Sequence, residues 1–157
     1  ENIYKFADEK LPVTLALSLH NTDNKNRSEL MPINRKYSIE EALAACKYYT
    51  EQTNTSLTVE YTLIKGVNDL EKNAQELRRL LQGINSHINL IPLNPIDEYR
   101  KDRPDNREIE HFRKKLEDMR LNVTIRRELG ADINASCGQL RRNYKESNSD
   151  KIHSPEQ

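Results

Sequence analysis

One cysteine near the end of the chain, Cys137, has neighbours that would suit a reacting thiol. It lies in the stretch NASCGQL (134–140), between the small residues Ser136 and Gly138, and is one of 2 cysteines in the 157 residues. A thiol there could be a buried filler, half of a disulfide, a metal ligand or a nucleophile. The stretch lacks apolar periodicity, which argues against core filling, and it has arginines on both sides. Nearby cations lower the pKa of a thiol and favour the nucleophilic thiolate.

The other cysteine, Cys46, lies on the apolar side of an expected helix and is predicted to be a small buried hydrophobe. Two cysteines in a chain without a visible signal peptide indicate a reducing cytoplasm and free thiols, with a disulfide to Cys137 as the alternative. His87 and His111 have no metal-ligand spacing with each other or with the cysteines. The residues alone therefore predict no metal site in this chain.

Polar side chains also stand where two strand-like runs end. Ser18 and His20 are two residues apart, so on a strand they would share a face and could bind a polar ligand or simply be solvated. No aspartate completes a hydrolase triad, and no GxSxG motif occurs. Asn94 lies between Pro92 and Pro95, which restrict the backbone and could hold its amide at a loop mouth. Asn before Pro is also a common turn former.

The elements that must position these groups are four strand-like runs and three helix-like segments. The runs cover residues 11–20, 56–65, 86–95 and 121–127. The segments begin at Ser38, at Asn68 or Asp69, and near Asp105, and a glutamate three residues after Ser38, Asn68 and Asp105 indicates capping boxes. Their apolar stripes consist of Leu43, Cys46 and Tyr49/Thr50, then Ala74, Leu77, Leu80 and Leu81, then Ile109, Phe112, Leu116 and Met119. This alternation predicts an α/β fold with a parallel sheet and right-handed crossovers.

The expected strands are apolar on one face and polar on the other. Polar positions alternate with apolar ones at Thr58, Glu60 and Thr62 in the second run, and at Asn122, Thr124 and Arg126 in the fourth. A sheet covered by helices on both sides should be apolar on both faces, whereas the inner face of a barrel can be polar where it holds a ligand. We therefore favour part of a (β/α) barrel over a doubly wound sheet, with ligands at the carboxyl ends of the strands. Four strands leave unpaired edges, which indicates a fragment of a larger barrel.

Composition and the chain ends limit which partners and which domain boundaries we expect. Lys+Arg and Asp+Glu are both 25, so net charge favours neither nucleic acid nor membrane. No apolar stretch approaches the roughly 20 residues that span a bilayer, so no membrane partner is expected. The chain does not begin with Met, and its first residues read like a helix already under way, which predicts that residues upstream are missing. Residues 143–157 have almost no apolar content and are predicted to be a disordered tail after a domain at 1–142.

Five long stretches occur in this order: VTLALSLH, NRSELMPINRKYSIEEALAACKYY, VEYTLIKGVND, INLIPLNP and VTIRRELGADINASCGQLR. Together they resemble the radical-SAM adenine methyltransferases of 23S rRNA and tRNA, the RlmN type, to which the Cfr resistance enzymes are closely related. The resemblance covers roughly residues 2–142. It implies that this chain is the C-terminal part of the family's methyltransferase domain, a partial (β/α) barrel of about four parallel strands alternating with three helices.

The resemblance also implies roles for the candidate residues. Ser18, Leu19, His20 and Asn94 match positions that bind S-adenosylmethionine in the family. Cys137 matches the cysteine that is methylated on sulfur during turnover. A second S-adenosylmethionine is cleaved by reduction at a [4Fe-4S] cluster, which requires an electron donor. The resulting radical converts the S-methyl group into the carbon that adds to C2 of adenosine in 23S rRNA or tRNA.

The sequence departs from the family's pattern at the cluster. The family binds it through a CxxxCxxC motif located upstream, whereas this chain has only Cys46 and Cys137, and neither lies in such a motif. The family's cofactor-binding Gly-Glu stretch and its second, resolving cysteine also lie upstream. We therefore expect this chain alone to be inactive and assign it the function of the parent enzyme. The alternatives are a C8-methylating, Cfr-like resistance enzyme and a non-catalytic RNA- or cofactor-binding remnant.

Overall fold

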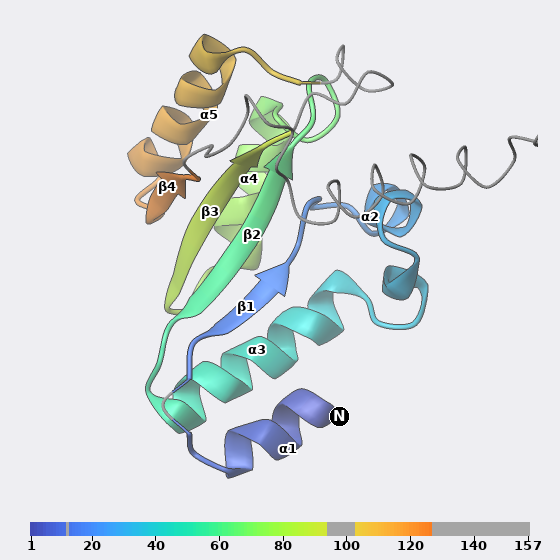
Figure 1. Cartoon of the computed structure of the whole chain (residues 1–157), viewed down its shortest axis with the longest axis vertical. Helices are drawn as coiled ribbons and strands as arrows, with labels where there is room; N and C mark the ends of the chain where they lie inside the picture. Colours follow the sequence, from blue (N-terminus) through green and yellow to red (C-terminus); the bar gives the residue numbers. More distant parts are fainter. Residues whose placement is uncertain (12, 94–102, 127–157) are drawn as a thin grey trace, which may run out of the picture. The chain divides into compact units, whose positions relative to one another are not determined.

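The structure, a computed structural model, describes residues 1–11, 13–93 and 103–126, all within one compact unit (1–126). Their elements, in chain order, are α1 (Asn2–Asp8), β1 (Leu15–Ser18), α2 (Asn24–Leu30), the 3-10 helix η1 (Pro32–Arg35), α3 (Ile39–Thr53), β2 (Leu57–Leu63), α4 (Glu71–Leu80), β3 (Ser86–Pro92), α5 (Asn106–Asp118) and β4 (Val123–Ile125) (Figure 1). The predicted boundary between a domain and a disordered tail at residue 142 lies outside the described residues and stays a prediction.

The four strands form one parallel sheet in the order β1-β2-β3-β4. Helices α3, α4 and α5 connect successive strands, which confirms the predicted α/β class and the alternation of four parallel strands with three helices. Two features differ from the sequence-based expectation. The strands at the two edges are short, with β1 starting only at Leu15 and β4 limited to Val123–Ile125. In addition, α2 and η1 stand between β1 and α3, where no helix was predicted.

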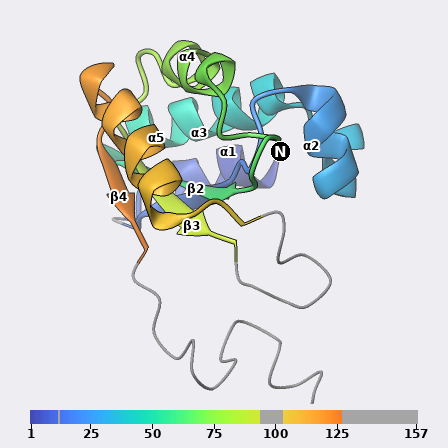
Figure 2. The same cartoon turned by 90° about the horizontal axis from the view of Figure 1, so that it is seen from above.

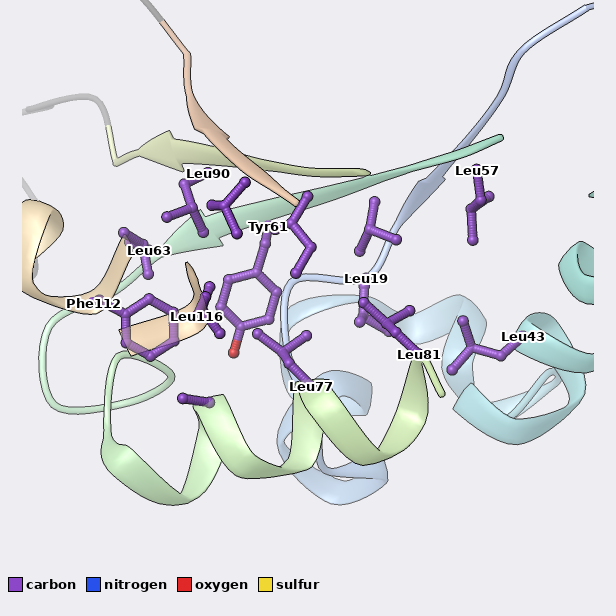
Figure 3. Close-up of a cluster of buried hydrophobic side chains, with 14 of the residues drawn as sticks. Leu19, Leu43, Leu57, Tyr61, Leu63, Leu77, Leu81, Leu90, Phe112 and Leu116 are labelled. Atoms are coloured by element: carbon purple, nitrogen blue, oxygen red, sulfur yellow. The ribbon is translucent and has the colours of Figure 1, made fainter. Parts of the chain in front are cut away.

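Helices cover one face of the sheet. Figure 2 shows α3 and α4 on the same side of β2 and β3, and Figure 3 shows side chains of β2, α4 and α5 meeting there. The alternate residues of β2 facing this side are fully buried: Leu57, Val59, Tyr61 and Leu63. The residues between them are half-buried, as expected for strands with one apolar and one polar face. In the described part of the chain, the polar face carries no helix.

The predicted apolar stripes form the core. Leu43, Cys46 and Tyr49 of α3, Ala74 and Leu77 of α4 with the following Leu81, and Ile109, Phe112 and Leu116 of α5 are all buried. Leu80 and Met119 are partly buried and pack against the same cluster. The expectation that Cys46 is a small buried hydrophobe is confirmed, and burial raises the pKa of its thiol to about 11. No helix in the described ranges has the length and apolarity needed to cross a membrane.

Two of the three predicted capping boxes are present. Ser38 caps α3 together with Glu41, and Asp105 caps α5 together with Glu108, each box satisfying backbone N–H groups that the helix leaves without partners. The predicted start of the helix between them is wrong, since α4 begins at Glu71 and not after Asn68 or Asp69. The Asn68 side chain is instead fully buried and bonds to the ends of two strands, as described below.

Candidate functional site at the carboxyl end of the first strand

The first strand leaves the sheet at Leu19, and this departure shapes the candidate site. The Leu19 N–H still donates to the Glu60 carbonyl of β2 at 3.0 Å, which continues the parallel pairing beyond Ser18. Continued pairing would give the Leu19 carbonyl the N–H of Thr62. That carbonyl accepts instead from the Asn21 N–H at 2.7 Å and from Arg27 Nε at 2.9 Å. The backbone therefore turns sharply away from β2 at the carboxyl end of β1.

The His20 side chain accepts the hydrogen bond that the Leu19 carbonyl would accept in a continued strand pairing. Its Nδ1 accepts from the Thr62 N–H at 3.1 Å, so the side chain continues the contact between β1 and β2. Its φ of 56° lies in the left-handed region, and the bond between Leu19 and Asn21 closes a three-residue turn around it. Such a turn is rare and strained for a residue with a side chain, and backbone strain of this kind concentrates at functional sites.

A buried amide holds this turn in place. Asn68 is fully buried, and its Nδ2 donates to the His20 carbonyl and to the Thr62 carbonyl, both at 2.7 Å. Its Oδ1 accepts from the Ile64 N–H at 2.7 Å, and its own carbonyl accepts from the Tyr61 hydroxyl at 2.9 Å. One residue thus joins the end of β1, the end of β2 and the loop that follows.

A buried guanidinium holds the other side of the turn. Arg27 of α2 is 4% exposed, and its Nη2 donates to the Ser18 carbonyl at 2.8 Å while its Nε bonds Leu19 as described above. Its Nη1 donates to Asn34 Oδ1, and the Asn34 amide in turn donates to the Asn24 carbonyl and to Ser28 Oγ. This polar cluster accounts for α2 and η1, whose buried residues are Arg27 and Asn34 and which enclose the arginine that fixes the strand end.

The sheet face that no described helix covers carries a row of polar side chains in register. Ser18, Glu60, Asn89 and Thr124 are paired across the four strands, so their side chains lie on the same face. Asn89 Nδ2 donates to both carboxylate oxygens of Glu60, at 3.2 and 3.3 Å. His87 Nε2 and Thr124 Oγ1 are 2.7 Å apart. The row reaches the carboxyl end of the sheet beside the His20 turn and offers hydroxyl, carboxylate and amide groups to a ligand.

The predicted site residues differ in their exposure, and two of them lie outside the described residues. Ser18 is exposed on the polar face, and its hydroxyl has no hydrogen bond to any described residue. Leu19 is fully buried in the core, so only its backbone can take part in binding. His20 lies beyond the end of β1, and its turn, not strand alternation, sets its direction. Asn94 and Cys137 lie outside the described residues, as do the arginines after Arg126, so the structure does not test their predicted roles.

Sequence reasoning missed Arg27, Asn68 and Asn89, and named Glu60 only as part of a polar face. Arg27 stands in the polar segment NKNRSEL, which looks like a solvated loop, and Asn68 resembles a helix cap. The one available signal was the alternation in LTVEYTL, which places a charged residue, Glu60, between two threonines on the polar face of the strand. Arg27 bonds to residues up to nine positions away and Asn68 to His20, 48 positions away, and neither contact follows from helix or strand periodicity.

At this strand end, the described residues offer hydrogen-bonding groups that suit a polar cofactor. Asn21, next to His20, is fully buried, and its Nδ2 is a buried donor without a hydrogen-bond partner among the described residues. The row of Ser18, Glu60, Asn89 and Thr124 supplies acceptors and donors on the polar face of the sheet. By contrast, the described ranges contain no group of three or more His, Cys, Asp or Glu side chains that could hold a metal ion. An iron–sulfur cluster also needs more thiolates than the 2 cysteines of this chain.

His20 should titrate below the ordinary histidine range. Desolvation lowers the pKa of its imidazole, the positive charge of Arg27 lowers it further, and Glu60 partly opposes both. The unfolded chain, with a histidine pKa of about 6.5, therefore takes up the proton first as the pH falls, and the free energy of unfolding should decrease below about pH 6.5. Protonation of Nδ1 would also break the bond from the Thr62 N–H.

An NMR titration of the His20 ring and denaturant unfolding between pH 5 and 8 check this expectation. The control is His20→Asn, because asparagine tolerates a positive φ and keeps a side-chain acceptor without titrating in this range. We expect the variant to lose the part of the pH dependence below about pH 6.5 that His20 contributes. A His20 ring that titrates at or above the value of an unfolded histidine would show that the described environment is wrong.

Comparison with known proteins places these features in a family context. No family model matches the chain. It is 51% identical over 142 residues to the "Probable dual-specificity RNA methyltransferase RlmN" of Caldanaerobacter subterraneus subsp. tengcongensis, which covers 90% of this chain and 42% of that protein. The protein of the same name from Clostridioides difficile is 48% identical over 143 residues, covering 91% and 42%. The chain thus spans less than half the length of these curated relatives.

Solved structures agree with these relatives. A radical SAM methyltransferase from Sphaerobacter thermophilus superposes with a TM-score of 0.81 at 44% identity, over 88% of this chain and 40% of that one. A domain of a pyruvate-formate lyase-activating enzyme from Bacteroides vulgatus matches with a TM-score of 0.57 at 20% identity, which supports the fold alone. The predicted fold, part of a radical-SAM barrel, is confirmed by the first of these likenesses together with the parallel sheet.

Proposed function

We propose, on the premise that this chain is a segment of the radical-SAM RNA methyltransferases of the RlmN type, that it belongs to an enzyme that methylates adenosine in RNA. The observation that carries the proposal is the near 50% identity over about nine tenths of the chain, which includes the strand end described above. The fold alone would not suffice, because one fold can host many chemistries.

In this proposal the carboxyl end of β1 binds S-adenosylmethionine. Ser18 would contact the cofactor through its hydroxyl and Leu19 through its backbone, while the turn at His20 shapes the site. Asn94, which lies outside the described residues, would contribute its side-chain amide. Arg27 and Asn68 do not need to touch the ligand, because their hydrogen bonds fix the carbonyls on either side of the turn. Preorganisation of this kind lowers the entropic cost of binding. When bound, S-adenosylmethionine supplies both the methyl group and, through its reductive cleavage, the radical chemistry.

The chain also contributes the thiol that carries the methyl group. We assign this role to Cys137, whose thiolate would accept the methyl on sulfur and hold the carbon next to C2 of an adenosine in 23S rRNA or tRNA. Adenine C2 is too electron-poor to attack a sulfonium methyl directly, so a protein-bound carbon and a radical route are required. The arginines around Cys137 would hold RNA phosphates, which predicts salt-dependent RNA affinity.

The 2 cysteines of this chain are too few to ligate a [4Fe-4S] cluster, so residues outside this chain must hold the cluster. We therefore derive no step from it and propose only that the complete enzyme receives electrons from a donor protein in the cytoplasm. The small number of cysteines favours one alternative, a non-catalytic RNA- or cofactor-binding remnant. A Cfr-like enzyme that methylates C8 is the other alternative, and the product distinguishes it.

A genetic experiment tests the proposal. The coding region is deleted in the host, 23S rRNA and tRNA are digested to nucleosides, and methylated adenosines are quantified by mass spectrometry. We expect 2-methyladenosine to be lost and to return when the complete gene is restored. Loss of 8-methyladenosine would indicate the C8 type, and unchanged methylation in both RNAs would indicate the remnant.

A further inference from the structure

Among the described residues, the Glu60 carboxylate has no partner of opposite charge within ion-pair distance. It lies half-buried at the centre of β2, on the sheet face that no described helix covers. Its hydrogen bonds come from Asn89 Nδ2, and no lysine or arginine of the described residues forms an ion pair with it. A partly desolvated carboxylate is costly unless hydrogen-bond donors or a cation compensate it. Asn89 is the one described side chain that donates to this carboxylate, so its oxygens can accept further hydrogen bonds from a ligand or from water.

The surroundings of Glu60 place it at the candidate site. Its backbone carbonyl accepts from the N–H of Leu19, and Ser18 is its register partner on β1. Its charge also acts on His20, where it raises the pKa of the imidazole against the larger effects of burial and Arg27. Glu60 therefore lies beside the turn that the proposed function assigns to cofactor binding.

The chemistry of a carboxylate limits the ligand groups that Glu60 can bind to hydrogen-bond donors and cations. An ionised carboxylate only accepts hydrogen bonds, and Asn89 leaves further lone pairs of both oxygens free. We propose that Glu60, held by Asn89, is a binding residue for S-adenosylmethionine and accepts hydrogen bonds from its hydroxyl or ammonium groups. This inference rests on the proposed function, because it takes the ligand from that assignment.

The test is binding to the complete, cluster-loaded enzyme, measured anaerobically by calorimetry. Glu60→Gln keeps the size of the side chain but replaces one acceptor oxygen by a donor. We expect its dissociation constant for S-adenosylmethionine to rise about tenfold to a hundredfold, since hydrogen bonds to charged groups contribute that much. Glu60→Asp, which keeps the charge but withdraws it by one methylene, should weaken binding in the same direction. Circular dichroism shows whether each variant is folded.

Two further arms make the result decisive. Thr58→Val removes a polar group on the same face of β2, one step further from the carboxyl end, and should leave the dissociation constant within about twofold. Methylthioadenosine has the ribose hydroxyls but no ammonium group. If Glu60→Gln weakens both ligands, the donor is a hydroxyl, and if it weakens S-adenosylmethionine alone, the donor is the ammonium group; either result supports the inference.

Other outcomes overturn it. Unchanged binding of S-adenosylmethionine by folded Glu60→Gln and Glu60→Asp would remove Glu60 from the site, and so would an equal loss in Thr58→Val. The proposed function fails separately, when the unsubstituted enzyme itself binds no S-adenosylmethionine.

Discussion

Replacement of Cys137 by alanine is expected to abolish methyl transfer to RNA in the complete enzyme. The thiolate is the proposed methyl acceptor, and alanine has no group that can carry the carbon, so no residual route through this position remains. Because the cofactor would be held mainly from the carboxyl end of β1, binding of S-adenosylmethionine should stay within about threefold of the unsubstituted enzyme. Iron content should also be unchanged. The measurement is the yield of 2-methyladenosine, alongside calorimetry and iron analysis of the same preparations.

Cys46→Ala is the matched control for that experiment. Cys46 is fully buried in the core, and the pKa of its thiol is raised to about 11, so little thiolate exists at neutral pH. We expect RNA methylation to continue in this variant, with a loss of about 1 kcal/mol in the free energy of unfolding from the lost packing. Full activity of Cys137→Ala would remove the proposed role of Cys137. A strong catalytic defect of Cys46→Ala at unchanged stability would show that the wrong cysteine was chosen.

Replacement of Arg27 by methionine should cause the largest loss of stability among the described polar residues. Methionine keeps most of the apolar stem, so the change removes mainly the donors to the Ser18 carbonyl, the Leu19 carbonyl and Asn34. Buried acceptors left without donors cost about 1–3 kcal/mol each, and partial rearrangement reduces the sum. We expect the free energy of unfolding to fall by about 2–4 kcal/mol, measured by denaturant titration with circular dichroism.

An exposed arginine provides the comparison. Arg79 of α4 forms a surface ion pair with Glu76, and its side chain is 62% exposed. Arg79→Met should therefore change stability by less than about 0.5 kcal/mol. Arg27→Lys should fall between the two, because one ammonium group cannot reproduce three bonds from a planar guanidinium. Equal losses of stability in Arg27→Met and Arg79→Met would show that Arg27 does not fix the strand end.

The elements that the sequence predicts well are those specified by local patterns. The capping boxes at Ser38 and Asp105, and the apolar stripes of α3 and α5, depend on residues three or four apart on one segment. The start of α4 was not predictable in this way, because Asn68 has the sequence context of a cap but bonds to the ends of two strands. Segments α2 and η1 were missed for a related reason, since a buried arginine and not an apolar stripe holds them.

The candidate site shows the same division between local and distant contacts. Strand alternation places Ser18 and Glu60 on the polar face without any knowledge of the fold. The turn at His20 could not be anticipated, because its positive φ depends on Arg27 and Asn68, which reach it from other elements. The roles of Asn94 and Cys137 still rest on the resemblance of their sequence stretches to the family.

The most direct test of the account follows the methyl group itself. The complete enzyme, reduced and loaded with its cluster, is incubated with 23S rRNA or tRNA and S-adenosylmethionine that carries a deuterium-labelled methyl group. Mass spectrometry of the digested RNA and of the peptide containing Cys137 then locates the label. We predict labelled 2-methyladenosine in the RNA and labelled S-methyl on Cys137 in protein sampled before RNA is added. RNA without label, from an enzyme whose cluster is intact and reduced, would contradict the proposed function.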